Sequence, residues 1–495
     1  MIRLSLFFFT LLYASIAQSE GALSQKLSDY LNKASPPDTS HSISVLQISD
    51  GAAIFEDHSD ELMIPASTSK LLISGVALTK WSPDFTFQTL LYRTGSISRG
   101  VVKGDLIVEG GGDPMITTEN LWRIAADLSL IGIKVFKGDL LLDNSRFDAL
   151  LRDTVDREAA KKSSSHAYDA PVTAFGVSFN TFPIAIAPGD ANGQKALVNV
   201  DPYPLDPLIS VSNQVKTVAQ IKKSEELLVS RVERDSKPGQ DSQSVVLAKG
   251  QVLLGSSLRK VYRSSSDPVL SSGAILRSFL KAFGIEVQGQ IKELSPGYNK
   301  KKTLLFVQDS QPLSLIIRSL NLYSNNYIAD VLLKNLGFHF QKEGSFLGGL
   351  AVLNESLRKD FGLRGDFQIA NASGLSPKNR LSARHFTSLL NAVSKDFKIF
   401  PEFLNSLSVS GKTGSLEKLF DRSPYDLLKG LVRAKTGTLS DPVTSCTLAG
   451  YLQHPRYGLL AFALLENGKN GFKTQPDQAS LRKFQEGFLL ELYRN

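Results

Sequence analysis

The chain has 495 residues, 42% of them hydrophobic, and a formal charge of +8, which allows two to four domains with substantial cores. The charge fits either an anionic partner or merely a soluble basic surface. No basic run with interleaved aromatic residues appears, which argues against nucleic acid binding. Six scattered histidines give no support for a metal site, and the single cysteine, Cys446, excludes an intramolecular disulfide. We expect neither a metal nor another cofactor.

The N-terminus has the pattern of a secretory signal peptide. Arg3 precedes an apolar run (LSLFFFTLLYA) of about eleven residues, which is too short to span a bilayer. The small residues Ser15 and Ala17 stand where a signal peptidase cleaves, so we predict a signal peptide over residues 1–17. A buried N-terminal helix is the alternative. We expect export to the periplasm or cell surface and no transmembrane segment after cleavage, because no later apolar run is long enough.

After the signal peptide, the pattern predicts a helix over residues 23–32, a hairpin over residues 41–59 and a helix that begins near Ser67. Strand-like runs then dominate residues 86–300, interrupted by an amphipathic helix at residues 119–130. We predict that this β-rich region is an insert with two subdomains.

From residue 300 onward, helices dominate until two strands, residues 443–452 and 457–465, and a final helix over residues 478–493. A sheet with strands from both ends of the chain indicates one discontinuous domain. We therefore predict an α/β domain that comprises residues 22–85 and 300–495.

Residues 64–72 (IPASTSKLL) join a turn to an apolar helical run. The hydroxyl of Ser67, in the first helical turn, would lie near free backbone N–H groups and the positive end of the helix dipole. Lys70 follows one turn later on the same face. Its amine can take the serine proton where its surroundings favour the neutral form, which leaves a nucleophile for acyl transfer.

Ser-x-x-Lys alone is not specific, because it occurs at Ser67, Ser257, Ser278, Ser356, Ser415 and Ser480. Three of the other serines (Ser278, Ser356 and Ser480) lie inside or against helical patterns, where the lysine is best explained as part of a solvated face. Only Ser67 combines a helix start with small neighbours that let a substrate approach. We assign Ser67 as the nucleophile and Lys70 as the base.

A second motif, Ser324-Asn325-Asn326, interrupts two apolar helical stretches. A hydroxyl and an amide two residues apart on such a connection can both face a cleft. Ser-x-Asn also begins at Ser178 and Ser319, so this motif gains weight only from its neighbours in the chain.

The third motif, Lys435-Thr436-Gly437, stands ahead of the strand predicted at residues 443–452. On a sheet edge its lysine and threonine can hold a carboxylate, and its glycine lets a substrate backbone approach. Lys-Thr-Gly also occurs at Lys412, between two helix-like stretches and without a strand to present it. We assign carboxylate binding to Lys435 and Thr436 and interpret Lys412 as a loop lysine.

In this order, the three motifs are the signature of β-lactamases and penicillin-binding proteins. A compact β-lactamase has no room for the 257 residues (324 − 67) between the first two serines. The layout resembles the low-molecular-mass penicillin-binding proteins of the D-alanyl-D-alanine carboxypeptidase/endopeptidase family, which carry a large insert here. Stretches such as GDLIVEGGGDP, YDAPVTAFGVSFNT and ASGLSPKNRLSA add to the resemblance. One departure is Asn371-Ala372, where the family usually has Asp-Gly.

The resemblance implies a penicillin-binding, β-lactamase-like transpeptidase domain with an antiparallel sheet flanked by helices. It also implies that Ser67 attacks the carbonyl of the penultimate D-alanine, with Lys70 as the base. Ser324 would relay the proton to the departing amine, and Asn326 would hold the substrate amide. The oxyanion would lie between the backbone N–H groups of Ser67 and Thr438.

By the same resemblance, Lys435 and Thr436 would bind the terminal carboxylate of peptidoglycan stem peptides that end in D-Ala-D-Ala. β-Lactams would acylate Ser67 as covalent inhibitors. Three alternatives remain: a β-lactamase, for which a Glu-x-x-Leu-Asn pattern is missing, a non-catalytic wall-binding protein, and an esterase, which needs no carboxylate grip.

Overall fold

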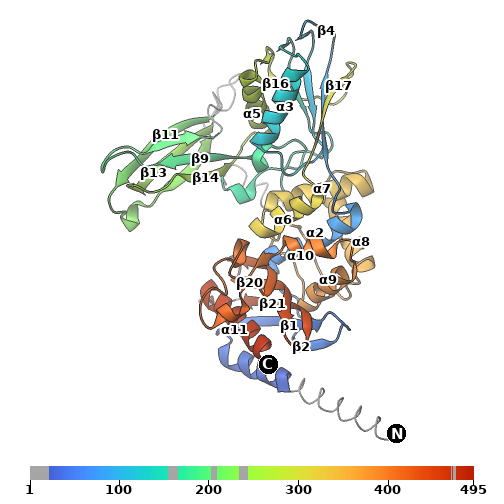
Figure 1. Ribbon diagram of the computed structural model, residues 1–495, viewed down its shortest axis with the longest axis vertical. Coiled ribbons are helices and arrows are strands. Elements are labelled where there is room, and N and C mark those ends of the chain that lie inside the picture. The colour runs from blue at the N-terminus through green and yellow to red at the C-terminus, as the bar shows by residue number, and fades with distance from the viewer. Residues whose placement is uncertain (1–21, 154–164, 202–208, 234–243, 470, 472–474) are drawn as a thin grey trace. The chain divides into compact units, whose positions relative to one another are not determined.

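The computed structural model describes residues 22–153, 165–201, 209–233, 244–469, 471 and 475–495 (Figure 1). The predicted signal peptide, residues 1–17, lies outside these ranges. Within them, no helix is both long enough and apolar enough to cross a membrane. The chain divides into two compact units: Met1–Phe85, Pro312–Ala329 and Leu350–Asn495 form the first, and Thr86–Gln311 and Asp330–Gly349 form the second.

The first unit is built on a six-stranded antiparallel sheet that joins the two ends of the chain. Its strand order is β18-β19-β20-β21-β1-β2, and the N-terminal β1 pairs along its whole length with β21, with Ile43 opposite Leu464. The strands are β1 (Thr39–Gln47), β2 (Ala53–Asp57), β18 (Ser408–Val409), β19 (Val432–Leu439), β20 (Ser445–His454) and β21 (Gly458–Gly468).

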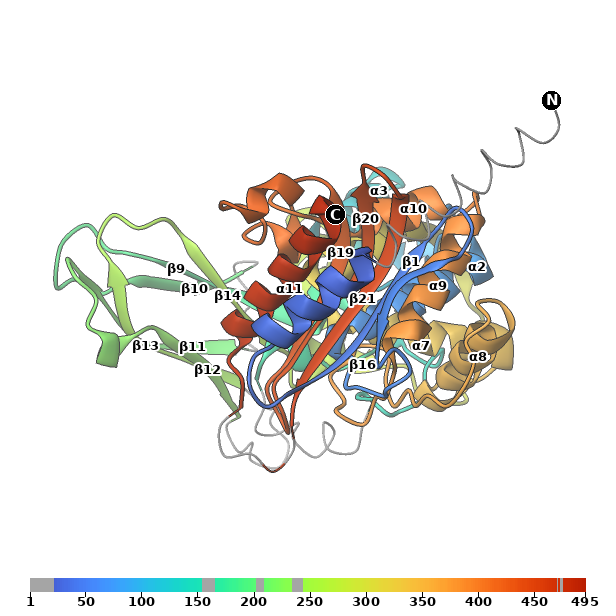
Figure 2. The ribbon, with the colours of Figure 1, turned by 90° about the horizontal axis from the view of Figure 1, so that it is seen from below.

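Helices cover both faces of this sheet, because its strands alternate two sets of buried side chains. One set, including Val45, Leu448 and Phe462, packs against the helix over residues 22–34 and against α11 (Gln478–Arg494). Figure 2 shows these two helices side by side on the sheet. On the opposite face, the Tyr451 hydroxyl donates to the Leu390 carbonyl of α9 at 2.7 Å.

The remaining elements of the first unit supply the turns that carry the sequence motifs. The short 3-10 helix η1 (Ala66–Ser69) leads directly into α2, and α6 ends at Ser324, just before α7 begins. The helices are α2 (Lys70–Trp81), α6 (Leu313–Tyr323), α7 (Asn326–Gln341), α8 (Phe346–Lys359), α9 (Ala383–Lys395) and α10 (Phe400–Ser406), with short η6 (Gly414–Leu416) and η7 (Tyr425–Leu428). The chain of α7 begins in the first unit and continues into the second.

Among its described residues, the second unit contains four sheets, the helices α3 and α5, and the greater part of α7. Two sheets share a core with α3 (Thr118–Leu130) and α5 (Pro268–Ala282): β16-β8-β6-β3-β17 and β15-β7-β5-β4. Their strands are β3 (Gln88–Arg93), β4 (Ile97–Ser98), β5 (Val101–Val102), β6 (Leu106–Glu109), β7 (Val135–Phe136), β8 (Leu140–Asp143), β15 (Glu286–Val287), β16 (Ile291–Glu293) and β17 (Thr303–Asp309).

The other two sheets of the second unit have three strands each, in the orders β10-β9-β14 and β11-β13-β12. Short 3-10 turns, η3 (Ala167–Asp169), η4 (Val177–Asn180) and η5 (Lys223–Glu225), accompany them. The strands are β9 (Thr181–Ala187), β10 (Leu197–Val200), β11 (Ile209–Val218), β12 (Leu228–Glu233), β13 (Ser244–Leu253) and β14 (Arg259–Ser264).

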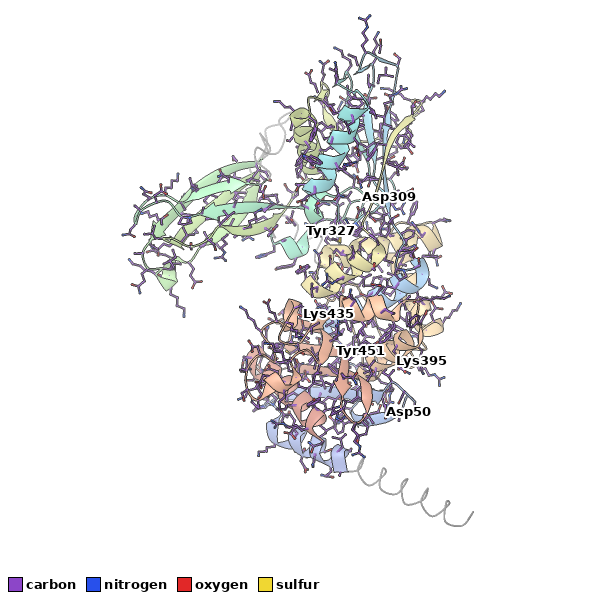
Figure 3. All side chains as sticks on the ribbon, in the orientation of Figure 1. Asp50, Asp309, Tyr327, Lys395, Lys435 and Tyr451 are labelled. Atoms are coloured by element: carbon purple, nitrogen blue, oxygen red, sulfur yellow. The ribbon has the colours of Figure 1, made fainter. Side chains whose placement is uncertain are left out.

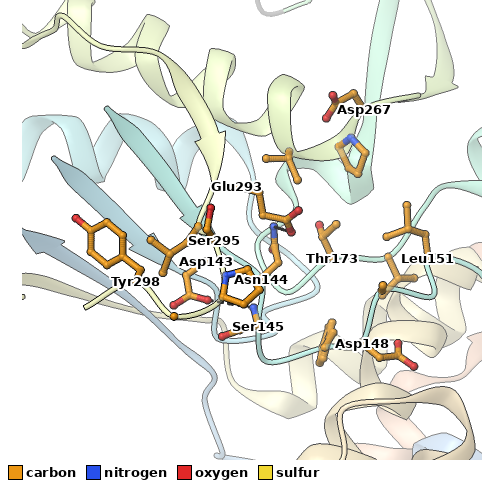
Figure 4. A pocket seen from close by; sticks show the side chains of 18 of the residues that line it. Asp143, Asn144, Ser145, Asp148, Leu151, Thr173, Asp267, Glu293, Ser295 and Tyr298 are labelled. Atoms are coloured by element: carbon orange, nitrogen blue, oxygen red, sulfur yellow. Dashed lines mark hydrogen bonds between the residues drawn. The ribbon is translucent and has the colours of Figure 1, made fainter. Parts of the chain in front are cut away.

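A cavity of about 700 Å³ lies in the second unit, at the carboxyl ends of the parallel strands β8 and β16 (Figure 4). Several of its carboxylates already serve the fold. Asp143 accepts from the Ser145 backbone N–H at 3.1 Å and lies 3.5 Å from the amine of Lys302. Asp267 caps α5 through the Leu270 N–H at 2.8 Å. These acidic groups are therefore explained by strand ends and a helix cap.

Two local predictions are wrong. Lys435 was expected ahead of a strand, but the whole triplet lies inside β19, which pairs with β20 so that Gly437 stands opposite Thr447. The segment around Lys412 was expected to lack a neighbouring strand, yet β18 ends three residues before it and pairs with β19. Within β19 (VRAKTGTL), Lys435 and Gly437 are residue types that are depleted in strands, which hides the strand in the sequence.

The packing of α11 on the sheet buries an acidic side chain. Glu466 of β21 has no exposed surface, and burial raises the pKa of its carboxyl from an ordinary 4.5 to about 8. One of its oxygens contacts the Gln485 amide of α11, and the other, Oε1, has no hydrogen-bond partner. The folded protein therefore holds a proton between pH 4.5 and 8 that the unfolded chain releases.

Because of this proton, the free energy of unfolding should fall as the pH rises. As pH rises from 4.5 to 8, the wild type should lose about 1.4 kcal/mol of stability per pH unit through Glu466. Glu466→Gln cannot ionise, so its melting temperature relative to the wild type should climb across this window and level off above it. Melting curves from pH 5 to 9 measure the difference. The exposed Glu61→Gln is the control, and a constant offset for Glu466→Gln would contradict the assignment.

Candidate active site

The segment that carries Ser67, the predicted nucleophile, is a tight turn with little space around it. Ala66 has a φ of +47°, which is rare for a residue with a side chain. A Cβ added at Gly374 would lie 2.0 Å from the Ala66 carbonyl oxygen, and one at Gly437 would lie 2.9 Å from the Ser67 nitrogen. The Thr447 hydroxyl donates to the Pro65 carbonyl at 2.8 Å. Backbone from a loop and from β19 thus touches the turn that carries Ser67, which only glycine allows.

The sequence motif Ser67/Lys70 becomes a direct contact in the structure. Lys70 is fully buried at the start of α2, and its Nζ donates to the Ser67 hydroxyl at 3.1 Å. The same Nζ donates to Asn326 Oδ1 at 2.7 Å and to the Ser373 carbonyl. These partners fix the amine beside the half-buried serine. Asn326, which is predicted to hold the substrate amide, therefore lies at the Ser67–Lys70 pair through a contact with Lys70 that the sequence did not predict.

Ser324 and Lys435 form a second pair. Ser324 ends α6 in the left-handed conformation, with a φ of +54°, and its hydroxyl accepts from the Lys435 amine at 2.9 Å. The same amine donates to the Thr436 carbonyl at 2.6 Å. Burial, followed by the charges of Lys70 and Arg482, lowers the pKa of Lys435 well below its usual value. Figure 3 marks Lys435 on β19 and Tyr451 on the neighbouring β20.

The outer edge of β19 is open beside this pair. The short β18 pairs only with Arg433 and Ala434, so among the described strands none pairs with this edge from Lys435 onward. Ser410 N–H donates to the Val432 carbonyl on the β18 side. Because successive residues of an antiparallel strand direct their backbone groups to opposite edges, the N–H groups of Thr436 and Thr438 also point to the open edge.

A serine that the sequence analysis set aside lies beside Thr436. The Thr436 hydroxyl donates to Ser415 Oγ at 2.8 Å. Ser415 begins one of the other Ser-x-x-Lys motifs and follows the other Lys-Thr-Gly triplet. Its hydroxyl lies next to a predicted carboxylate-binding group, whereas Lys412 itself is exposed. A pairing between two distant segments had no signal in the sequence.

The loop that supplies Ser373 is held by amide groups. Asn371 stands where the family usually has Asp, and its Oδ1 accepts from the Gly374 N–H and from the Asn379 amide, both at 3.1 Å. The Asn379 amide also contacts Ser69 Oγ at 3.3 Å. The departure from the family pattern thus keeps an acceptor at the position where the loop needs one, and the loop contacts η1.

The other candidate motifs do not join this group. Ser278 lies in α5, and its hydroxyl donates to its own helix at Ala274. Ser356 is buried in α8 and donates to Asp360 at 2.5 Å. Ser480 donates to Asp477, the N-cap of α11. Within the ranges that the structure describes, no group of three or more His, Cys, Asp or Glu side chains could hold a metal ion.

Comparison with known proteins finds related carboxypeptidases. D-alanyl-D-alanine carboxypeptidase DacB of Haemophilus influenzae is 27% identical over 460 residues, which cover 90% of each chain. The D-alanyl-D-alanine carboxypeptidase of an Actinomadura strain is 25% identical over 439 residues, 86% of this chain and 77% of its own.

Solved structures show the same fold. The crystal structure of penicillin binding protein 4 (dacB) from H. influenzae superposes with a TM-score of 0.74 at 25% identity and covers 94% of this chain and 99% of that one. The same protein complexed with a β-lactam superposes with a TM-score of 0.70. The α/β fold with a helix-flanked sheet is therefore the fold of this penicillin-binding protein. The model of the D-Ala-D-Ala carboxypeptidase 3 (S13) family matches residues 23–486, and the chain belongs to this peptidase family.

Proposed function

We propose that this protein is a serine D-Ala-D-Ala carboxypeptidase, with DD-endopeptidase activity, that acts on peptidoglycan stem peptides through an acyl-enzyme. The observation that carries the proposal is the contact between Lys70 Nζ and Ser67 Oγ at 3.1 Å. A serine within hydrogen-bond reach of a buried amine is the arrangement that nucleophilic catalysis requires. The second pair, the buried Lys435 and the half-buried Ser324, provides a cation and a hydroxyl for a peptide that ends in a carboxylate.

In the acylation step, Ser67 Oγ attacks the carbonyl carbon of the penultimate D-alanine while Lys70 takes its proton. The new C–O bond forms as the carbonyl electrons move to the oxygen. Ser324 then relays to the departing amine, as the C–N bond breaks, the proton that Lys70 took from Ser67. Its contact with Lys435 at 2.9 Å supports this role, because the lysine orients the serine hydroxyl. Water hydrolyses the ester in the last step.

The oxyanion would form between the backbone N–H groups of Ser67 and Thr438. Two observations support this: Gly437 lies close to the Ser67 nitrogen, and the alternation along β19 directs the Thr438 N–H to the open edge. One such donor is worth about 3–4 kcal/mol in comparable enzymes. The oxyanion therefore depends on how the nucleophile turn lies against β19.

The terminal carboxylate of the substrate would bind Lys435 and Thr436, with Ser415 beside the Thr436 hydroxyl. Binding an anion favours the ammonium form of Lys435, whose lowered pKa otherwise favours the neutral amine. The H. influenzae relative crystallised in complex with a β-lactam supports binding of this class of compound, which would acylate Ser67. Asn326 would hold the substrate amide in addition to its contact with Lys70.

The proposal also covers the cellular location of the protein and the roles of its domains. Residues 1–17 would act as a signal peptide for export to the periplasm or the cell wall, where the positive charge of the protein faces an anionic polymer. Residues 22–85 and 300–495 would form the catalytic domain. The region 86–300 would carry no catalytic group, since all three motifs lie outside it.

Digestion of purified muropeptides tests the function. Loss of one alanine from pentapeptides, detected by mass spectrometry, would demonstrate carboxypeptidase activity, and cleavage of cross-linked dimers would demonstrate endopeptidase activity. A β-lactamase would instead turn over penicillin rapidly, and a non-catalytic wall-binding protein would neither form an adduct nor release alanine.

Replacing the nucleophile should abolish both chemistry and labelling. Ser67→Ala removes the hydroxyl that Lys70 contacts, so we expect no alanine release and no covalent band with a fluorescent penicillin. Ser257→Ala, at an exposed serine of another Ser-x-x-Lys motif, is the control and should retain both. Covalent labelling that survives in Ser67→Ala would show that another residue is the nucleophile.

Substitutions in the two Lys-Thr-Gly triplets should differ sharply in their effect on kcat/KM. A charge-assisted hydrogen bond to a carboxylate contributes about 1.5–3 kcal/mol, so Lys435→Ala should lower kcat/KM on peptides ending in D-Ala-D-Ala at least about tenfold. Lys412→Ala changes an exposed loop residue and should leave kcat/KM near the wild-type value. Steady-state release of D-alanine measures both, and the reverse ranking would contradict the assignment.

A further inference from the structure

Arg482 of α11 lies under the strand that carries the third motif, and sequence analysis gave it no role. Its Nη2 donates to the Gly437 carbonyl and to Thr438 Oγ1, both at 2.7 Å. Its Nη1 donates to the Thr447 carbonyl at 3.0 Å and to Gln485 Oε1 at 2.7 Å. One guanidinium therefore joins β19, β20 and α11 at a single point.

These contacts use the Nη protons of the guanidinium. The two Nη atoms carry four protons, and the four contacts go to four acceptors within the protein. A planar, rigid donor of this kind holds its acceptors in a fixed arrangement, which a flexible ammonium group does not reproduce. These contacts indicate that Arg482 positions the protein's own backbone.

Arg482 contacts the residues of β19 and β20 that pack against the turn carrying Ser67. Gly437 and Thr447 form one register pair across β19 and β20. Gly437 lies against the Ser67 nitrogen, and the Thr447 hydroxyl donates to the Pro65 carbonyl at 2.8 Å. A shift of this pair would move both the strand edge and the turn that presents Ser67.

A buried polar network anchors Arg482 from behind. Gln485, one turn further along α11, accepts from Arg482, and its amide donates to the Cys446 carbonyl at 3.2 Å and to the Glu466 carboxyl. Glu466 and Gln485 are both buried. The guanidinium is therefore held by the interior of the first unit rather than by a mobile surface contact.

We infer that Arg482 is a positioning residue for acyl transfer: from α11 it holds the Gly437–Thr447 pair in register, so that the Thr438 N–H and the Ser67 N–H converge on the oxyanion. This inference rests on the proposed function. By this inference, α11 contributes to the chemistry although it does not contact the substrate.

The inference predicts which kinetic step changes. The oxyanion exists only after attack begins, so loosening its donors should slow acylation and leave initial binding of the ligand nearly unchanged. Arg482→Ala should lower the first-order acylation constant for a fluorescent penicillin at least tenfold, with the dissociation constant of the preceding complex altered less than threefold. Arg482→Lys, which keeps the charge but not the fork, should recover part of the loss.

Two controls separate positioning from general destabilisation. Lys483→Ala removes the adjacent exposed cation of α11 and should acylate like the wild type. Leu492→Ala removes buried volume from the same helix about ten residues away and should lower the melting temperature without lowering the acylation constant, measured well below melting. An equal loss of acylation in Leu492→Ala would overturn the inference.

A double-mutant cycle keeps the test decisive where Arg482→Ala folds poorly. Thr438→Val removes the hydroxyl that Arg482 contacts and keeps the backbone N–H. If Arg482 acts through this contact, Thr438→Val should slow acylation, and the effects of Arg482→Lys and Thr438→Val should combine to less than their product. Full multiplicativity, or wild-type acylation in Arg482→Ala, would overturn the inference. Absence of acylation in the wild type itself would instead refute the proposed function.

Discussion

The site depends on one close packing contact, between the turn that carries Ser67 and the strand β19. Gly437 and Gly374 let two backbone segments approach this turn to distances that a side chain would prevent. The turn also adopts an unfavourable conformation at Ala66, with a φ of +47°, which persists only because the surrounding structure fixes it. Hydrogen bonds from Thr447 and the contact of the Asn379 amide with Ser69 supply that constraint. Strain at the nucleophile is thus held by packing from two sides.

Whether the sequence could predict a feature of the site depends on how far apart in the chain the interacting residues lie. The helix start at Ser67 and the lysine one turn later are local, and periodicity places them well; the N- and C-terminal strands of one sheet also follow from alternation. The contact of Asn326 with Lys70 joins residues 256 positions apart, and the Thr436–Ser415 contact joins β19 to the short η6, which share no sequence pattern. Such pairings are set by tertiary packing, which no local pattern encodes. Resemblance to a family supplied the motif set, but not Arg482, which belongs to no motif.

The position of the Lys435 triplet inside β19 illustrates the same limit. Its lysine and glycine disfavour a strand by propensity, and pairing with the almost entirely buried β20 overrides that preference. Under the proposed function this override matters, because the part of β19 beyond the short β18 has an unpaired outer side that can offer backbone N–H groups to a ligand. A residue such as Thr438 therefore matters to the proposed chemistry through its backbone, and its side chain is free to serve Arg482.

Charge balance completes the argument for a carboxylate-bearing substrate. Lys435 is fully buried, and its hydrogen bonds go to Ser324 and to a carbonyl, both neutral; the four acceptors of Arg482 are also neutral. Burying a cation with neutral partners is costly, which is why the pKa of Lys435 falls. A ligand that brings one negative charge to the open edge of β19 removes this cost, whereas a neutral ester or amide does not. Under the proposed function, this cost would favour substrates with a free terminal carboxylate.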